Sequence, residues 1–273
     1  MHSEGGAFLG RLARVSVCMA TYNGATYVGE QLRSILDELD DQDEVIVVDD
    51  ASSDATVDVI NALDDPRVRV HLQPRNRGYV RTFERAMGLA TGDVVMLADQ
   101  DDVWVAGRRK MLLDGLQHGH VVASNLVLLG DDAPLRSPLT GRPWELHAAT
   151  SRQRVRNELR ILAGAAPYFG CAMAVRKEFL GVVTPFPEFV VESHDLWIAT
   201  VANAFGELRH VEHATVRRRI HESNASSPRA RGVRAALRSR WMLVRAWREA
   251  ARRRRAFARR LVGASRASDQ LHD

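Results

Sequence analysis

Cysteine and long apolar runs are both scarce in this 273-residue sequence. The two cysteines, Cys18 and Cys171, lie in apolar stretches, which favours buried free thiols in a reducing cytosol over a disulfide scaffold. No apolar run approaches the roughly 18 residues that a membrane-spanning helix needs. Glu4 and the short apolar run that follows it argue against a secretory signal at the N-terminus.

Several motifs of nucleotide and hydrolase chemistry are missing as well. The sequence lacks G-x-x-x-x-G-K-[ST] and G-x-G-x-x-G, which argues against a P-loop NTPase and a dinucleotide oxidoreductase. No Ser-His-Asp or Cys-His arrangement is apparent, so we expect no enzyme nucleophile. With 45% apolar and 26% charged residues, the chain should be globular, with a large core and room for an appendage.

Charge is unevenly distributed behind the net value of +4. Residues 217–266 contain 17 arginines and two acidic residues, a local charge of +15, whereas residues 1–216 carry −9. We therefore expect an acidic body with a basic C-terminal arm. Such an arm is suited to contact with an anionic surface.

Apolar runs and helix-period patterns alternate along the body, which predicts a doubly wound α/β sheet with a mostly parallel core. Ligands bind such sheets at the carboxyl ends of the strands. The expected strands are 15–20, 44–48, 68–72, 93–98, 121–129, 168–175 and 207–220. The expected helices are 28–39, about 54–63, 79–90, 108–117, 151–162, 194–205 and the segment from about 230, with a long loop over 131–150.

Three carboxylates, Asp99, Asp101 and Asp102, directly follow the strand expected at 93–98. They repel one another unless a cation or hydrogen-bond donors neutralise them. Hard oxygen ligands of this kind suit Mg²⁺ or Mn²⁺, commonly shared with substrate phosphates. A solvated acidic turn is the alternative, but the position at a strand end favours a metal site.

Two other strand ends carry polar clusters. Tyr22 follows the first strand and can stack on a base or simply pack, and turn N–H groups beside it can meet phosphate. Asp49 and Asp50 end the second strand, where a carboxylate can accept a hydrogen bond from a pyrimidine imide or a ribose hydroxyl. Capping of the next helix by Asp49 is the alternative.

Two later clusters complete the set of candidates. Asp195 lies at an expected helix start, either as a general base or as an acid that interacts with the helix dipole, and His194 is either its partner or a surface residue. His221 can ligate a metal as neutral imidazole, and the arginines at 217–219 can neutralise a diphosphate leaving group. A polar strand end and loop is the alternative for this last segment.

The order of these motifs resembles family 2 glycosyltransferases of the GT-A fold over about residues 14–226. The pairing of DQDDVW with HDLWIA is similar to the bacterial rhamnosyltransferase-like branch. The motifs are TYNG, VVDDAS, NRG at 76–78, LADQDDVW, YFGCAMAVRKEFL, ESHDLWIA and RRRIHESN. That branch often has Pro and then Lys after the DQDDVW tryptophan. Here Val105 to Arg108 follow, and Arg108 retains the charge.

The resemblance implies a GT-A domain over residues 1–226, with a nucleotide-sugar half (about 14–130) and an acceptor half (131–226), followed by an Arg-rich helical arm (227–273). It implies metal-dependent, inverting transfer of a sugar from a nucleoside-diphosphate sugar to a hydroxyl of a cell-envelope glycan or lipid-linked acceptor. The first donor expected is dTDP-rhamnose and the second a UDP-sugar. A non-catalytic nucleotide-sugar-binding or membrane-targeting subunit is the alternative.

The same resemblance assigns roles to individual positions. Asp195 corresponds to the catalytic base. The donor would contact Ala20, Tyr22, Asn23, Asp50, Asn76, Gly78, Asp99 and Arg108, with Tyr22 against the base and Asp50 on the pyrimidine ring. Mg²⁺ or Mn²⁺ would be held among Asp99, Asp101, Asp102 and His221, and the division of metal and ribose contacts among the three acids stays open.

The arm forms a basic amphipathic helix on a helical wheel. We expect residues 230–262 to contact an anionic membrane, which would place this cytoplasmic protein at the inner face of the cell membrane. Docking of the apolar side on the body is the alternative. Nucleic acid is an unlikely partner because the body lacks basic patches with interleaved aromatic residues. The expected apolar side contains Leu237, Trp241, Leu243, Val244, Trp247, Ala251, Phe257 and Leu261.

Overall fold

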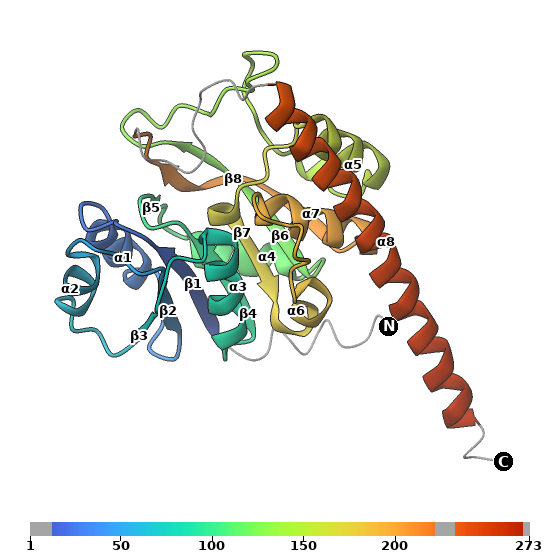
Figure 1. The fold of residues 1–273 in the computed structure, drawn as a ribbon, viewed down its shortest axis with the longest axis horizontal. Helices are drawn as coiled ribbons and strands as arrows, with labels where there is room; N and C mark the ends of the chain where they lie inside the picture. Colours follow the sequence, from blue (N-terminus) through green and yellow to red (C-terminus); the bar gives the residue numbers. More distant parts are fainter. Residues whose placement is uncertain (1–12, 222–232, 270–273) are drawn as a thin grey trace.

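One eight-stranded sheet with helices on both faces organises the computed structural model, which describes residues 13–221 and 233–269 (Figure 1). The strands are β1 (Val15–Thr21), β2 (Glu44–Asp49), β3 (Val68–Leu72), β4 (Val94–Ala98), β5 (Val103–Trp104), β6 (Val121–Leu128), β7 (Met173–Arg176) and β8 (Leu208–Arg218). The α-helices are α1 (Val28–Leu36), α2 (Thr56–Asn61), α3 (Tyr79–Leu89), α4 (Arg108–Leu116), α5 (Arg154–Ala163), α6 (Lys177–Val183), α7 (His194–Phe205) and α8 (Val233–Asp269). Two 3₁₀ turns are η1 (Ala148–Thr150) and η2 (Gly170–Ala172).

The sheet order is β3-β2-β1-β4-β7-β6-β8-β5. Strands β3, β2, β1 and β4 are parallel neighbours, as are β6 and β8, whereas β7 pairs antiparallel with both β4 and β6. This confirms the expected doubly wound, mostly parallel sheet. Because β1, β2 and β4 are parallel and adjacent, their carboxyl ends meet at one edge, and the motifs that follow them share that edge.

Burial on both faces explains the continuous apolar runs of the central strands. In β1, Val17 and Met19 join the core on the side of α1, and Cys18 joins the core on the side of α3. Both cysteines are buried and free, as expected. None of the helices in the described ranges is long and apolar enough to cross a membrane.

Several element boundaries differ from the expectation. The first helix ends at Leu36 rather than near 39, and α5 begins at Arg154 rather than 151. The apolar segment 168–175 is mostly an irregular segment with a 3₁₀ turn, and only Met173–Arg176 forms a strand. The short elements β5 and α6 were not expected, because two to seven residues carry too little periodicity to reveal them.

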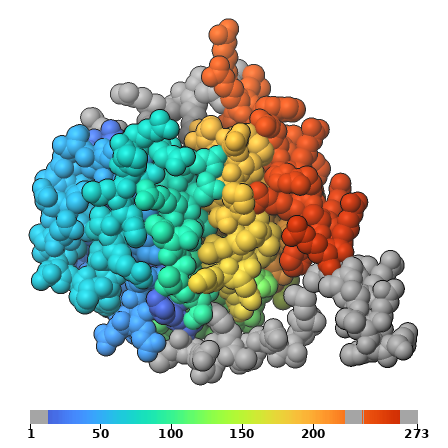
Figure 2. Space-filling view, turned by 60° about the horizontal axis from the view of Figure 1, so that its bottom comes forward, coloured from blue at the N-terminus to red at the C-terminus, as the bar shows by residue number. Residues whose placement is uncertain are grey.

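The arm forms helix α8, which packs on α7 and α5 and extends beyond the body (Figure 1). Figure 2 shows the described part of α8 along one flank, beside the yellow segment that contains α6. Its buried seam consists of Met242, Leu243, Ala246 and Ala250. The middle of α8 therefore docks on the body, which was the alternative interpretation of the arm.

The side of α8 that packs on the body differs from the apolar side predicted from the sequence. Trp241 is 58% exposed and Trp247 is 47% exposed, although both were placed on the apolar side. Small residues at Ala246 and Ala250 let the backbone of α8 approach α7 closely, so they form the seam. Leu261 lies outside the side chains that the structure describes, as do residues 222–232 between β8 and α8.

Arg253 fastens α8 to the body. Its guanidinium donates hydrogen bonds to the carbonyls of Val182, Val183 and Pro185 and lies over the ring of Trp197 at 4.9 Å. It also forms an ion pair with Glu249 one turn earlier, at 3.0 Å. The contact is largely shielded from solvent, since the Arg253 side chain is 17% exposed.

We predict that Arg253→Ala lowers the free energy of unfolding by about 2 kcal/mol, because several charge-assisted hydrogen bonds to partly buried carbonyls are lost. Urea denaturation of the full chain measures this change. Arg252→Ala is the matched control: Arg252 pairs with the same Glu249, but its side chain is 70% exposed, and little change is expected. Equal losses for the two variants would contradict the assigned role of Arg253.

Candidate active site

An acidic cluster at the carboxyl end of β4 forms the centre of the candidate site. Asp99, Asp101 and Asp102 follow β4 directly, and the two-residue strand β5 then pairs antiparallel with the end of β8. This pairing carries the segment after β8 back across the cluster. The backbone N–H of Arg219 donates to Asp102 Oδ1 at 3.1 Å, and His221 Nε2 lies 2.8 Å from Asp101 Oδ2.

Burial and the repulsion of neighbouring carboxylates disfavour the charged forms of Asp99 and Asp102. Burial, followed by the charges of Asp102 and Asp101, raises the pKa of Asp99 to about 8. Burial, followed by the charge of Asp101, raises the pKa of Asp102 to about 6. Arg218 opposes both shifts. The cluster therefore has an excess of negative charge that a bound cation would compensate.

The donor atoms present fit a divalent cation. Asp102 Oδ2 is buried without a hydrogen-bond partner among the described residues. Carboxylate oxygens of Asp99 and Asp102 and the sulfur of Cys171 all lie within 4.8 Å of one another, and the Asp101–His221 pair lies beside them. Sequence reasoning placed Cys171 only as a buried thiol, because nothing in its segment shows that the turn before β7 reaches the acids.

Asp195 lies in the first turn of α7, where it approaches the same cluster. Its Oδ1 accepts a hydrogen bond from the N–H of Leu196 at 2.8 Å, and its charge contributes to the raised pKa of Asp99. Burial raises the pKa of Asp195 to about 6, opposed by the Leu196 N–H and by Arg218. A carboxylate with this pKa is ionised at neutral pH and is a stronger base than an ordinary aspartate.

The charge of Arg218 acts on both Asp195 and the acidic cluster. Its guanidinium lies over the ring of Phe169 at 5.1 Å. Arg217 pairs with Asp132 on the long loop. Arg219 donates to the carbonyl of Asp101 at 3.1 Å, pairs with Glu30 and lies over Tyr27. The sequence could not show which of these three arginines faces the acids, because their partners come from different parts of the fold.

Hydrogen bonds to the backbone of Tyr22 fix its position, and its ring is partly exposed to solvent. Gln100, within the DQDD motif, accepts from the Tyr22 N–H at 2.9 Å and donates to the Tyr22 carbonyl at 3.1 Å. A Cβ at Gly24 would lie 2.3 Å from the Gln100 amide oxygen, so a larger residue there would displace this amide from Tyr22. The Tyr22 side chain is 48% exposed and available for stacking. Sequence reasoning missed Gln100.

The other predicted donor residues near the strand ends shape loops. Asn23 has φ +48° and its side-chain oxygen accepts from the N–H of Ser53, while the Asn76 side-chain oxygen accepts from the N–H of Gly78. Gly78 itself has φ +81°, a conformation that favours glycine. Ala20, near the end of β1, is half-buried and packs against the core. These positions can contribute backbone geometry to a donor site.

Asp50 is deeply buried, and its carboxylate accepts hydrogen bonds from the protein. Its Oδ1 accepts from the side chain of Gln73 and from the N–H of Arg77, both at 2.7 Å, and its Oδ2 accepts from the N–H of Gly78 at 2.8 Å. Three of about four acceptor positions of the carboxylate are therefore occupied by protein donors. Asp49 accepts from Thr21 and Ser52, so it orders the turn after β2 and does not cap α2.

Arg108 lies in the core, contrary to its predicted place against the donor. It is fully buried and donates to the carbonyls of Leu97 (3.2 Å) and Cys171 (2.6 Å) and to the hydroxyl of Thr215 (2.6 Å). Its guanidinium also lies over the Trp104 ring at 4.4 Å. Burial lowers the pKa of Arg108 to about 10, so the side chain remains charged at neutral pH. It stabilises the segments that carry the site through these hydrogen bonds.

His194 is neither a surface residue nor a partner of Asp195. Its ring stacks on Phe83 at 4.4 Å, edge-on to Tyr79, and both ring nitrogens are buried without hydrogen-bond partners among the described residues. Burial lowers the pKa of His194 to about 3. The side chain is a neutral core aromatic, and its place next to Asp195 in the sequence misled the prediction.

Comparison with known proteins identifies the class to which this fold and site belong. Residues 16–181, more than half of the chain, match the model of the family described as glycosyl transferase family 2. The chain belongs to that family. Its fold is similar to the crystal structure of residues 1–349 of S. aureus TarS in complex with UDP-GlcNAc, with a TM-score of 0.65 and 19% identity over 85% of this chain and 66% of that one. The expected GT-A fold is thereby confirmed.

Two curated relatives are similar over part of their length. An uncharacterized glycosyltransferase of Nostoc is 32% identical over 111 residues, which are 40% of this chain and 34% of that protein. The dTDP-rhamnosyl transferase RfbG of Shigella flexneri is 30% identical over 118 residues, which are 40% of this chain and 41% of that protein. The match thus spans less than half the length of these relatives.

We predict that Arg108→Met lowers the free energy of unfolding by about 3 kcal/mol, because buried oxygens lose their charged donor. Guanidinium denaturation measures the change, with Lys110→Met on the exposed side of α4 as the matched control. An Arg108 variant that keeps its stability and loses only nucleotide affinity would contradict the structural role and restore the original prediction.

Proposed function

We propose that this chain catalyses transfer of a sugar from a nucleoside-diphosphate sugar to a hydroxyl group, with inversion at the anomeric carbon. The observation that supports this most strongly is the convergence of two separate acidic groups on one site. Asp99, Asp101 and Asp102 come from the end of β4, Asp195 comes from the start of α7, and Arg218 acts on both. Membership of glycosyl transferase family 2 agrees with this chemistry.

Within the proposal, the two acidic groups have different tasks. Asp99, Asp101 and Asp102, with His221, would hold Mg²⁺ or Mn²⁺ next to the donor diphosphate. The cation, when bound, supplies positive charge that stabilises the departing nucleoside diphosphate. Arg218 adds a second positive charge from the protein. Tyr22 would stack on the base, and the loops shaped by Asn23, Asp50, Asn76 and Gly78 would enclose the nucleotide.

Asp195 is proposed to act on the acceptor. Its carboxylate would take the proton of the acceptor hydroxyl as the oxygen attacks the anomeric carbon. The new carbon–oxygen bond forms while the bond from the anomeric carbon to the diphosphate oxygen breaks. One displacement of this kind inverts the configuration and needs no covalent enzyme intermediate.

The proposed donor is a pyrimidine nucleotide sugar, with dTDP-rhamnose first and a UDP-sugar second. The relative RfbG is named a dTDP-rhamnosyl transferase, and the TarS structure contains UDP-GlcNAc. The proposed acceptor is a cell-envelope glycan or a lipid-linked sugar, and two further relatives from Escherichia coli are named for transfer to a diphosphoundecaprenol-linked sugar. Residues 14–130 would bind the donor and 131–226 the acceptor.

Contact of α8 with an anionic membrane belongs to the same proposal. The docked helix leaves Leu237, Trp241 and Trp247 exposed, and exposed arginines, among them Arg248 and Arg259, occupy its outer side. Aromatic rings together with arginines are typical of helices that lie at the surface of anionic membranes. This contact would place the candidate active site at the inner face of the cell membrane.

Calorimetric titration with dTDP, UDP, GDP and ADP tests the donor site, with and without Mn²⁺. We expect metal-dependent binding of a pyrimidine diphosphate. Since changes to groups that only support a metal ligand weaken binding about 10- to 100-fold, Asp101→Asn should weaken it at least tenfold. Asp114→Asn, which removes an exposed carboxylate of α4, is the control. Metal-independent binding that survives Asp101→Asn would refute the metal site.

Asp195→Asn tests the proposed base. It should lower kcat by about 100- to 10,000-fold while donor affinity stays close to that of the original chain. In the original chain, kcat/KM should fall about tenfold per pH unit below the pKa of Asp195, because the protonated carboxyl cannot accept the acceptor's proton. That pKa is raised to about 6, so the decline should begin near pH 6. A decline that begins near pH 4 would assign the base elsewhere.

A non-catalytic nucleotide-sugar-binding subunit is the second candidate. It would bind donor as proposed but show no turnover for Asp195→Asn to abolish. The raised pKa of Asp195 favours the enzyme, because a carboxyl with a raised pKa beside an acidic cluster is typical of general bases.

A further inference from the structure

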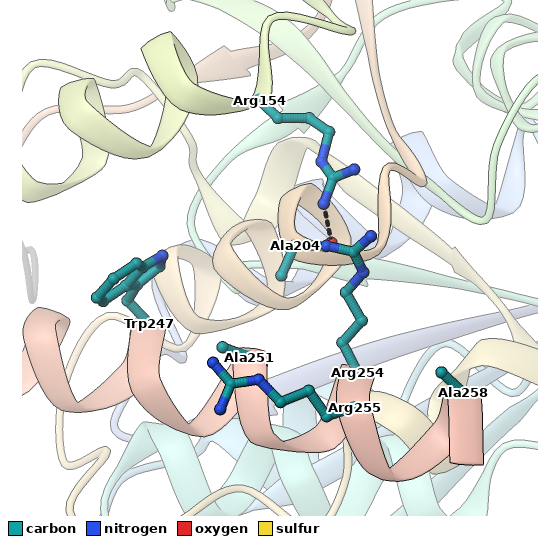
Figure 3. A pocket seen from close by; sticks show the side chains of 7 residues that line it. All are labelled: Arg154, Ala204, Trp247, Ala251, Arg254, Arg255 and Ala258. Atoms are coloured by element: carbon teal, nitrogen blue, oxygen red, sulfur yellow. Dashed lines mark hydrogen bonds between the residues drawn. The ribbon is translucent and has the colours of Figure 1, made fainter. Parts of the chain in front are cut away.

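A groove between α8 and the α5–α7 pair lies outside the candidate active site. It encloses about 430 Å³. Figure 3 shows Arg154 and Arg254 reaching toward one another from α5 and α8, while Arg255 extends in the direction of Trp247. The seven lining residues include three arginines and no acid: Arg154, Ala204, Trp247, Ala251, Arg254, Arg255 and Ala258.

The positive charge of the groove exceeds what its surroundings neutralise. Arg154 donates to the carbonyls of Asn203 and Ala204 and so caps the C-terminus of α7. A helix C-terminus supplies only about half a negative charge, against three guanidinium groups. Burial, followed by the charge of Arg254, lowers the pKa of Arg154, and Figure 3 shows the two side chains reaching toward one another.

One end of the groove carries exposed apolar side chains. A neighbouring hollow of about 290 Å³ shares Arg154, Ala204 and Trp247 with the groove and is also lined by Val155, Asn203 and Glu158. Burial raises the pKa of Glu158 to about 7. Val155 and Leu159 lie one turn apart on α5 and are 76% and 61% exposed. A ligand that fits both parts therefore has an anionic group joined to an apolar one.

We propose that this groove binds the phosphodiester headgroup of an anionic phospholipid, with the phosphate among Arg154, Arg254 and Arg255. The glycerol and the first part of the acyl chains would lie on Trp247 and Val155. A phosphate accepts charge-assisted hydrogen bonds from several guanidinium groups at once, which relieves their mutual repulsion. The inference rests on the proposed membrane contact of α8 and makes it specific: one site recognises one class of lipid.

The test uses the full chain and monomeric short-chain phosphatidylglycerol, with phosphatidylcholine of the same length and inorganic phosphate as comparison ligands. Calorimetry or Trp247 fluorescence, with Trp247→Phe as the blank, measures binding. We expect phosphatidylglycerol to bind more tightly than either comparison ligand. The double variant Arg254→Gln/Arg255→Gln should weaken this binding at least about tenfold, since two charge-assisted contacts are lost.

A matched control separates the site from general attraction to charge. Arg238→Gln/Arg260→Gln removes the same charge from exposed positions of α8 that do not line the groove, and should change phosphatidylglycerol affinity less than about twofold. Arg154 is left intact in both variants because it caps α7. Circular dichroism and the unfolding midpoint check that both variants remain folded.

The outcomes distinguish the groove from the broader membrane proposal. Equal losses for the two double variants, or phosphate binding as tight as that of the lipid, would overturn the groove as a lipid site. If the original chain still binds phosphatidylglycerol vesicles in that case, the membrane contact of α8 stands without it. If the chain binds neither monomeric lipid nor vesicles, both ideas fail, whereas donor titration would still test the active site independently.

Discussion

A single buried guanidinium connects three segments around the acidic cluster. Arg108 donates to Leu97 at the end of β4, to Cys171 before β7 and to Thr215 in β8. A buried charge is costly unless it is well paired, and its removal deprives the partner oxygens of a charged donor. Together with the hydrogen bonds of the sheet, this side chain therefore fixes the relative positions of the three segments.

The acidic cluster after β4 and Asp195 are subject to the same positive charge. Asp99 and Asp102 after β4 and Asp195 on α7 all have raised pKa values, and the same residue, Arg218, opposes each shift. The charge of Asp195 also contributes to the raised pKa of Asp99. The two acidic groups are therefore coupled electrostatically through Asp99 and Asp195.

Sequence patterns predicted the fold and the meeting of the strand ends, because both follow from hydrophobic periodicity and the geometry of parallel sheets. The family resemblance, rather than these patterns, placed Asp101 and His221 in one site, and their side chains do meet although they lie 120 residues apart. The patterns did not give the environment of every side chain. They failed for Arg108 and His194, because a motif gives a position in the chain but not which face of the fold receives the side chain. They failed for the seam of α8 because Ala246 and Ala250, not the tryptophans, determine how closely that helix packs.

The packing of α8 along α7 fixes the distance between Asp195 and the arginine-lined groove. Helix α7 begins next to Asp195 and ends where Ala204 meets the arginine-lined groove. Nine residues separate the two points, about 14 Å at the rise of an α-helix. Any surface held at the groove would therefore stand at a set height from the carboxylate, and an acceptor anchored in that surface would have to span that height to be glycosylated.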